Sequence, residues 1–135
     1  MKRRTCLHLI PALATARSLL AASGVERLRV GICAFSCHQH WKAVGSDFAG
    51  VKFHDAVGFY RYGRELGAEG VQTSLRNGDA AMAREVRTLV EQDGGYYEAD
   101  VRLPKEPGDV PAFDQLLGLA REAGAAVARS VFTGG

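Results

Sequence analysis

Short apolar segments of strand length alternate with longer amphipathic segments from residue 25 onward, and this alternation constrains the fold more than any other feature. Four segments rich in β-forming side chains are predicted as strands: 28–35, 70–75, 96–101 and 126–132. Apolar residues recur at helical spacing in three intervening segments, predicted as helices: 53–66, 77–93 and 109–123. The polar, glycine-containing segment 36–51 after the first strand is predicted as a loop. Short returns between helix and strand favour parallel pairing with right-handed crossovers. The sequence therefore predicts an α/β fold of parallel β/α units, with four strands and three helices.

The helix ends carry recognisable signals. Asp55 and Asp109 precede apolar periodic segments and suit N-cap positions, with Pro111 in the first turn of the last helix. The motif R-E-x-G-A-x-x-V occurs at 64–71, and again at 121–127 with one residue fewer between its Ala and Val, each time where a helix leads into a strand. A glycine there closes the helix and lets the chain turn sharply. The repetition supports the architecture and carries no information about chemistry.

Two architectures contain four such units. A complete (β/α)₈ barrel typically needs about 250 residues, and this chain has 135. A nucleotide-binding doubly wound sheet usually has a glycine-rich phosphate turn directly after its first strand, whereas this chain has F-S-C-H-Q-H-W at 35–41. A parallel strand normally has a helix covering it, but only T-G-G follows the fourth strand. We therefore predict the N-terminal half of a TIM barrel over residues 25–135.

The N-terminal segment differs in charge from the remainder. The chain carries a net charge of +2, and residues 1–22 hold four basic and no acidic side chains, so residues 23–135 carry −2. A basic head with Arg3-Arg4, a short apolar run and small residues resemble a twin-arginine export signal over residues 1–24. This predicts an exported, periplasmic protein; a basic N-terminus on a cytoplasmic protein is the alternative. The weak net charge does not predict a nucleic-acid partner, and no apolar run approaches the ~20 residues of a membrane span.

A series of motifs in the same order resembles the sugar phosphate isomerase/epimerase family with the xylose-isomerase-like (β/α)₈ barrel. The motifs are the Phe35-Ser36 end of the first strand, F-H-D-A-V-x-F-Y, L-G-A-E-G-V-Q, Tyr96-Tyr97-Glu98-Ala99 before Leu103-Pro104-Lys105, Asp109-Val110 with Phe113, and A-G-A-x-x-x-R-S-V-F-T-G-G. The resemblance covers about residues 27–135 and matches the N-terminal half of that barrel.

The resemblance implies proton transfer at a carbon next to a carbonyl, assisted by a divalent metal (Mn²⁺, Mg²⁺, Co²⁺ or Zn²⁺). In the family the metal is held by Glu, Asp and His of later strands, so no position of this chain inherits a metal-ligand role. We therefore expect an incomplete or inactive part of a sugar (phosphate) isomerase or epimerase. The alternatives are a non-catalytic half-barrel that binds sugar or associates with a second copy through its open sheet edges, and an open-sheet nucleotide binder.

Four residues are predicted to contact a sugar or sugar phosphate, because sites in such barrels gather at the carboxyl ends of strands. They are Arg129, Glu98, Gln72 and His40. Arg129 suits a hydroxyl, carboxylate or phosphate; the alternative is an ion pair with Glu98 across neighbouring strands. Glu98 is a candidate acid or base, with a solvated or Arg-paired carboxylate as the alternative. A glutamine such as Gln72 is more often an ordinary polar strand residue than a ligand contact.

The spacing Cys33-x-x-x-Cys37-His38-x-His40 contains zinc-binding residue types. We disfavour a metal site because Cys33 lies inside an apolar strand and no second pair follows at zinc-finger spacing. A Cys33–Cys37 disulfide needs a sharp turn between residues four apart. The sequence therefore predicts no metal ligands here.

Overall fold

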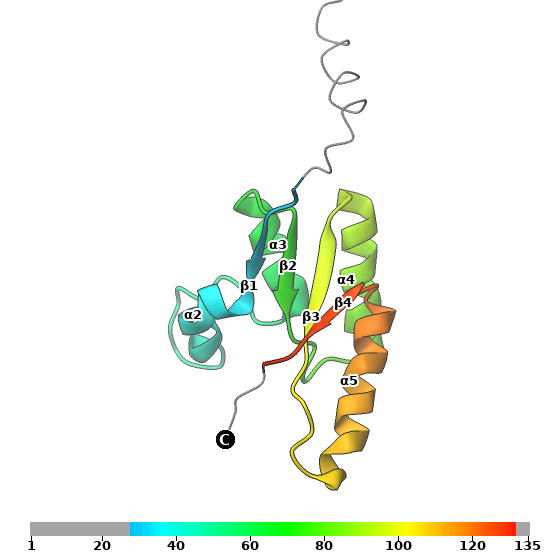
Figure 1. Ribbon diagram of the computed structural model, residues 1–135. Helices are drawn as coiled ribbons and strands as arrows, with labels where there is room; N and C mark the ends of the chain where they lie inside the picture. Colours follow the sequence, from blue (N-terminus) through cyan, green and yellow to red (C-terminus); the bar gives the residue numbers. More distant parts are fainter. Residues whose placement is uncertain (1–27, 132–135) are drawn as a thin grey trace, which may run out of the picture.

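The protein was analysed as a computed structural model, which describes residues 28–131. The export signal predicted over residues 1–24 lies outside the described residues. The elements in chain order are β1 (Gly31–Cys33), η1 (Ala34–Cys37), α2 (His38–Ala43), α3 (Ala56–Glu65), β2 (Gly70–Thr73), α4 (Ala80–Asp93), β3 (Tyr96–Asp100), η2 (Pro107–Asp109), α5 (Val110–Glu122) and β4 (Val127–Arg129). Figure 1 shows their arrangement.

The four strands form one sheet with the order β1-β2-β3-β4, and every neighbouring pair is parallel. This confirms the predicted parallel β/α units. Each strand is therefore added next to the preceding one, and the sheet grows in a single direction. Because right-handed crossovers that step in one direction put every connecting helix on one face of the sheet, α3, α4 and α5 lie together.

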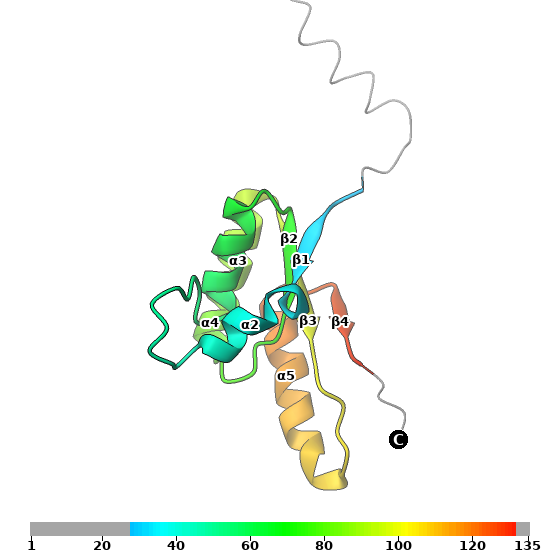
Figure 2. The ribbon, with the colours of Figure 1, turned by 90° about the vertical axis from the view of Figure 1, so that its left-hand side faces the viewer.

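Figure 2 shows this layering, with the three long helices on one side of the sheet. A doubly wound sheet would carry helices on both faces, and residues 28–131 do not form that arrangement. The face turned toward the viewer in Figure 1 has no long helix over it among the described residues. We call it the uncovered face.

The hydrophobic core lies between the helices and the opposite face of the sheet. Its largest fully buried side chains are Tyr60, Phe53, Phe59, Val71 and Val86. Side chains alternate between the faces of a strand, and β2 follows this rule, with Val71 and Thr73 buried and Gln72 half-buried between them. The sheet therefore presents an apolar face to the helices and a polar one to the other side.

Local capping agrees with the predicted signals in two helices. The Asp55 carboxylate accepts from the Gly58 N–H at 2.7 Å at the start of α3, and Gly94 ends α4 in the left-handed conformation with φ 59°. Asp109 differs from the prediction. Its carboxylate accepts from the N–H groups of Lys105 and Glu106 at 3.0 and 3.2 Å, so it orders the turn before α5 and makes no side-chain cap bond to that helix.

The segment after β1, expected to be a polar loop, contains η1 and α2. The reason is tertiary packing of Trp41, whose ring lies 4.8 Å from Phe53 and 5.5 Å from Phe59 between centroids. Aromatic pairs at such separations stabilise beyond simple burial. Strand β1 is correspondingly three residues long, because the chain turns into η1 at Ala34.

Candidate functional site

Three of the four predicted contact residues meet in one row on the uncovered face. The sheet register pairs Gln72 with Glu98, and it pairs Arg129 of β4 with Asp100, two residues beyond Glu98 on β3. Gln72 Nε2 donates to Glu98 Oε2 at 2.8 Å, and Arg129 Nη1 donates to Gln72 Oε1 at 2.8 Å. The strands β2, β3 and β4 therefore contribute one hydrogen-bonded side chain each.

The row differs from the direct Arg129–Glu98 ion pair considered from sequence. The Gln72 amide stands between the two charges, because its oxygen accepts and its NH₂ group donates. Gln72 is thus the bridging residue of the row. Side-chain pairing across strands follows from register, and register is a property of the sheet that the sequence of one strand does not contain.

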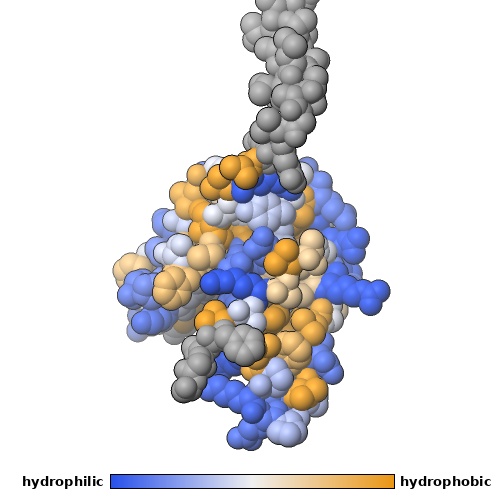
Figure 3. All heavy atoms as spheres, in the orientation of Figure 1, coloured by the Kyte–Doolittle hydropathy of each residue, from blue (hydrophilic) through white to orange (hydrophobic). Residues whose placement is uncertain are grey.

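The chemistry of the row suits a polyhydroxylated ligand. Glu98 is half-buried and Arg129 is exposed, and each retains hydrogen-bonding capacity after its bond with Gln72. A carboxylate accepts and a guanidinium donates, whereas a sugar hydroxyl does both. Figure 3 shows hydrophilic residues over the middle of this face, with hydrophobic residues beside them.

Tyr96 bounds the row on the amino-terminal side. A Cβ atom added at Gly70 would overlap the Tyr96 ring, and one added at Gly31 would overlap its hydroxyl, so the ring extends across both glycines of the neighbouring strands. The Arg29 guanidinium lies 5.0 Å from the ring centroid. Close approach of a ring to two backbones explains why β1 and β2 begin with glycine.

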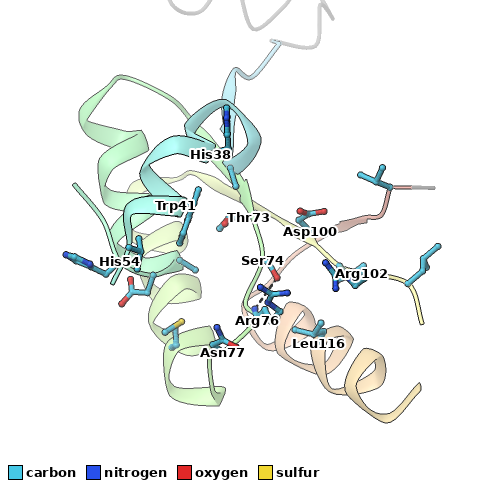
Figure 4. A pocket seen from close by; sticks show the side chains of 18 of the residues that line it. His38, Trp41, His54, Thr73, Ser74, Arg76, Asn77, Asp100, Arg102 and Leu116 are labelled. Atoms are coloured by element: carbon cyan, nitrogen blue, oxygen red, sulfur yellow. Dashed lines mark hydrogen bonds between the residues drawn. The ribbon is translucent and has the colours of Figure 1, made fainter. Parts of the chain in front are cut away.

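The carboxyl ends of the strands open into a pocket of about 1010 Å³ (Figure 4). Ser74 and Asp100 follow the row toward this end, and both line the pocket.

The Tyr97 hydroxyl donates to the Thr73 carbonyl at 2.6 Å and anchors the end of β2. Burial of Tyr97 raises the pKa of its hydroxyl. In Figure 4 the His54 side chain points away from the pocket.

Three basic residues surround the pocket on the side of the β2–α4 and β3–α5 loops: Arg76, Arg102 and Lys105. All three are exposed, and their side chains make no ion pair within residues 28–131. Sequence reasoning missed them because, beyond the first strand, it considered strand residues and not the loops that follow. The usable signal was their position: each comes shortly after a predicted strand.

His40, the fourth predicted contact residue, is not part of the row. Its ring stacks on Phe53 with centroids 5.5 Å apart and lies 6.2 Å from Tyr62. It belongs to the aromatic packing of α2 against α3. The segment after β1 reaches the pocket through other residues, which are Ala34, His38, Trp41 and Val44.

The cysteine and histidine motif does not assemble into a metal site in the described part of the chain. Residues 28–131 contain no group of three or more His, Cys, Asp or Glu side chains placed to hold a metal ion together. A hydrogen bond with Ser36 lowers the pKa of Cys33, and burial raises the pKa of Cys37. The described residues thus do not fit the divalent metal implied by the family resemblance, and we derive no step through such an ion.

Comparison with known proteins returned no relative. No protein-family model, curated protein or solved structure matches the chain. Within residues 28–131, none of the helices is both long and apolar enough to cross a bilayer. The α/β class is therefore established by the parallel sheet itself, and the function is argued from the row and the pocket.

Proposed function

We propose that this chain is the N-terminal half of a (β/α)₈ barrel of the sugar (phosphate) isomerase/epimerase type, and that it binds a sugar or sugar phosphate. The observation that carries the proposal is the Gln72–Glu98–Arg129 row, which lies on the side of the sheet that faces inward in a closed barrel. The in-order strand arrangement with helices on one face supports the barrel assignment.

The row also contains a group suited to proton transfer. The Glu98 carboxylate takes the proton from the carbon next to the sugar carbonyl, the hydroxyl proton on that carbon passes to the carbonyl oxygen, and the Glu98 carboxyl returns its proton to the former carbonyl carbon. The two proton transfers give isomerisation without net gain or loss of protons. Gln72 orients this carboxylate, and Arg129 holds a hydroxyl or the developing oxyanion. A divalent metal supplies oxyanion stabilisation in the family, and the described residues gather no ligands for it. We therefore propose sugar binding for this chain and place turnover in a completed barrel.

Replacing Gln72 by alanine is expected to weaken sugar binding at least tenfold, which corresponds to about 1.4 kcal/mol. The substitution removes the bridge that orders both charged side chains. Isothermal titration calorimetry of the complete chain with pentoses, hexoses and their phosphates measures the change. Glu98→Gln keeps the hydrogen-bonding shape and removes the charge, so it is expected to retain binding better than Gln72→Ala.

Gln92→Ala is the matched control, since Gln92 is exposed near the end of α4 and away from the sheet. Its affinity is expected to equal that of the unaltered chain. Absence of saturable binding to every sugar tested, or an equal loss in both glutamine variants, would contradict the proposed sugar site.

A second candidate function is self-association of two half-barrels, favoured by the exposed apolar residues at both ends of the sheet. Val30 and Phe35 flank β1 and are 69% and 79% exposed, and Val127 and Val131 on the β4 side are 49% and 60% exposed. A second copy related by a two-fold axis puts β4 of each copy beside β1 of the other, which closes both edges at once.

The paired form predicts an apparent mass of about twice the 14.5 kDa chain mass in light scattering after gel filtration. Val127→Lys introduces a charge at the β4 edge and is expected to give the monomer. Leu66→Lys, at an equally exposed apolar position beyond α3, is expected to leave the pair intact. A monomer for the unaltered chain at high concentration would exclude this arrangement.

A further inference from the structure

A second, smaller pocket lies between the β2–α4 and β3–α5 loops, beside the carboxyl-end pocket. Its volume is about 480 Å³. Its floor is apolar and comes from Leu75 at the end of β2 and from Phe113, Leu116 and Leu119 of α5. Gln72 and Glu98 do not line it. The small pocket is therefore distinct from the row, although it shares Arg76, Arg102 and Lys105 with the carboxyl-end pocket.

Positive charge borders this apolar floor. Arg76, Arg102 and Lys105 all line the small pocket, and in Figure 4 Arg76 and Arg102 lie near Ser74 above Leu116. None of the three side chains has a hydrogen-bond or ion-pair partner within the described range of the chain. Three cations gathered around one cavity repel each other, and the single carboxylate that lines it, that of Asp109, leaves an excess of positive charge that favours an anion.

The acidic residue of this pocket, Asp109, makes no ion pair with any of the three cations within residues 28–131. The Asp109 carboxylate is bound to the backbone N–H groups of Lys105 and Glu106, and these bonds hold the loop that carries Lys105. On the other side, the Arg76 N–H donates to Ser74 Oγ at 3.1 Å, and the Gly78 N–H donates to the Leu75 carbonyl at 2.8 Å. Both loops are thus ordered by their own hydrogen bonds, with the basic side chains left available.

We propose that this pocket binds a small phosphate monoester whose organic part is apolar. The phosphate group receives charge-assisted hydrogen bonds from the guanidinium groups of Arg76 and Arg102, and Lys105 adds a third positive charge. Guanidinium groups match the tetrahedral oxygens in a bidentate manner, and the low-dielectric floor strengthens the attraction. The organic part lies against Phe113 and Leu116.

Phenyl phosphate is the test ligand, with inorganic phosphate and phenol as its two halves. Calorimetric titration of the complete chain at low salt is expected to show saturable binding of phenyl phosphate, at least fivefold weaker binding of inorganic phosphate, and none of phenol. Arg102→Gln and Arg76→Gln are each expected to weaken phenyl phosphate binding at least tenfold. Raising the salt concentration is expected to weaken it as well, since the contacts are ionic.

Arg84→Gln provides the control, because it removes one positive charge from α4, where Arg84 contacts Glu122 and not the pocket. Unchanged binding in this variant supports the site, and circular dichroism verifies that each variant is folded. The proposal is overturned if phenyl phosphate does not bind saturably, if Arg84→Gln weakens binding as much as Arg102→Gln, or if inorganic phosphate binds as tightly as the ester. Loss of phenyl phosphate binding in Arg102→Gln, with binding of an unphosphorylated sugar retained, separates this site from the row.

Discussion

Replacing Phe59 by alanine is expected to lower the free energy of unfolding by about 3–5 kcal/mol, the range for large aromatic truncations in a core. Phe59 is fully buried in α3. Its ring centroid lies 4.9 Å from that of Phe53 and 5.5 Å from that of Trp41, so the truncation opens a cavity where α2 meets α3. A domain of this size has about 5–15 kcal/mol of stability in total, and the loss therefore removes a large part of it.

Urea denaturation followed by tryptophan fluorescence measures this loss. The chain has one tryptophan, and Trp41 itself contacts the altered position, so its emission reports the local packing as well as global unfolding. Phe48→Ala is the matched control, because Phe48 is 60% exposed and its loss is expected to change stability by less than about 0.5 kcal/mol. Equal losses in the two phenylalanine variants would contradict the assigned core.

Replacing Gly70 by alanine is expected to destabilise the protein by about 1–3 kcal/mol, the usual cost of forcing additional atoms into a packed site. The new methyl group overlaps the Tyr96 ring on the uncovered face. The ring cannot move freely, because Arg29 packs over it and donates to the Gly94 carbonyl at 2.6 Å. Thermal unfolding monitored by circular dichroism measures the effect.

A double-mutant cycle with Tyr96→Ala identifies the cause. When the ring is absent, Gly70→Ala is expected to cost less than about 0.5 kcal/mol, so the coupling energy accounts for nearly all of the loss. Gly118→Ala, in α5 with open space around the added methyl group, is expected to stabilise by about 0.5–1 kcal/mol through helix propensity. A Gly70→Ala cost that persists without the ring would show that the strain lies in the backbone.

The Phe59 and Gly70 substitutions alter the two sides of the sheet. One side carries the long helices, and the other carries the proposed sugar site. Phe59 belongs to the apolar layer that holds the helices, and Gly70 belongs to the face on which the Gln72–Glu98–Arg129 row lies. A substitution in the apolar layer is expected to affect stability and every binding activity together. A substitution on the uncovered face is expected to disturb the row while the helical layer stays folded. Variants on that face therefore separate effects on site geometry from effects on folding.

The order and type of the long elements were predictable because each is encoded locally. Helical spacing of apolar residues and cap signals such as Asp55 and Gly94 act within a few residues, so the three long helices occur close to their predicted positions. Segment 36–51 was predicted less well. Helix α2 has six residues, too few to be stable alone, and it forms because Trp41 packs on a different helix.

The candidate site divides in the same way. Residue types at strand ends pointed to Gln72, Glu98 and Arg129 from sequence, but which of them meet was decided by register and by the neighbouring order of β2, β3 and β4. The amide bridge between two charges and the basic rim from two different loops arise only when segments distant in the chain lie side by side. His40 was also predicted from the sequence to contact the sugar. In the structure its ring stacks on Phe53, so it belongs to the aromatic cluster.

The alternation of strands and helices and the parallel direction of the strands were predictable from the chain alone, since local periodicity and short returns specify both. Three other features depend on the assembled sheet: the placement of all three long helices on one face, the bridge that Gln72 makes between Glu98 and Arg129, and the loop cations around an apolar floor. The physical reason is that periodicity is a short-range property of the chain, whereas contacts between strands and loops depend on how distant segments come together.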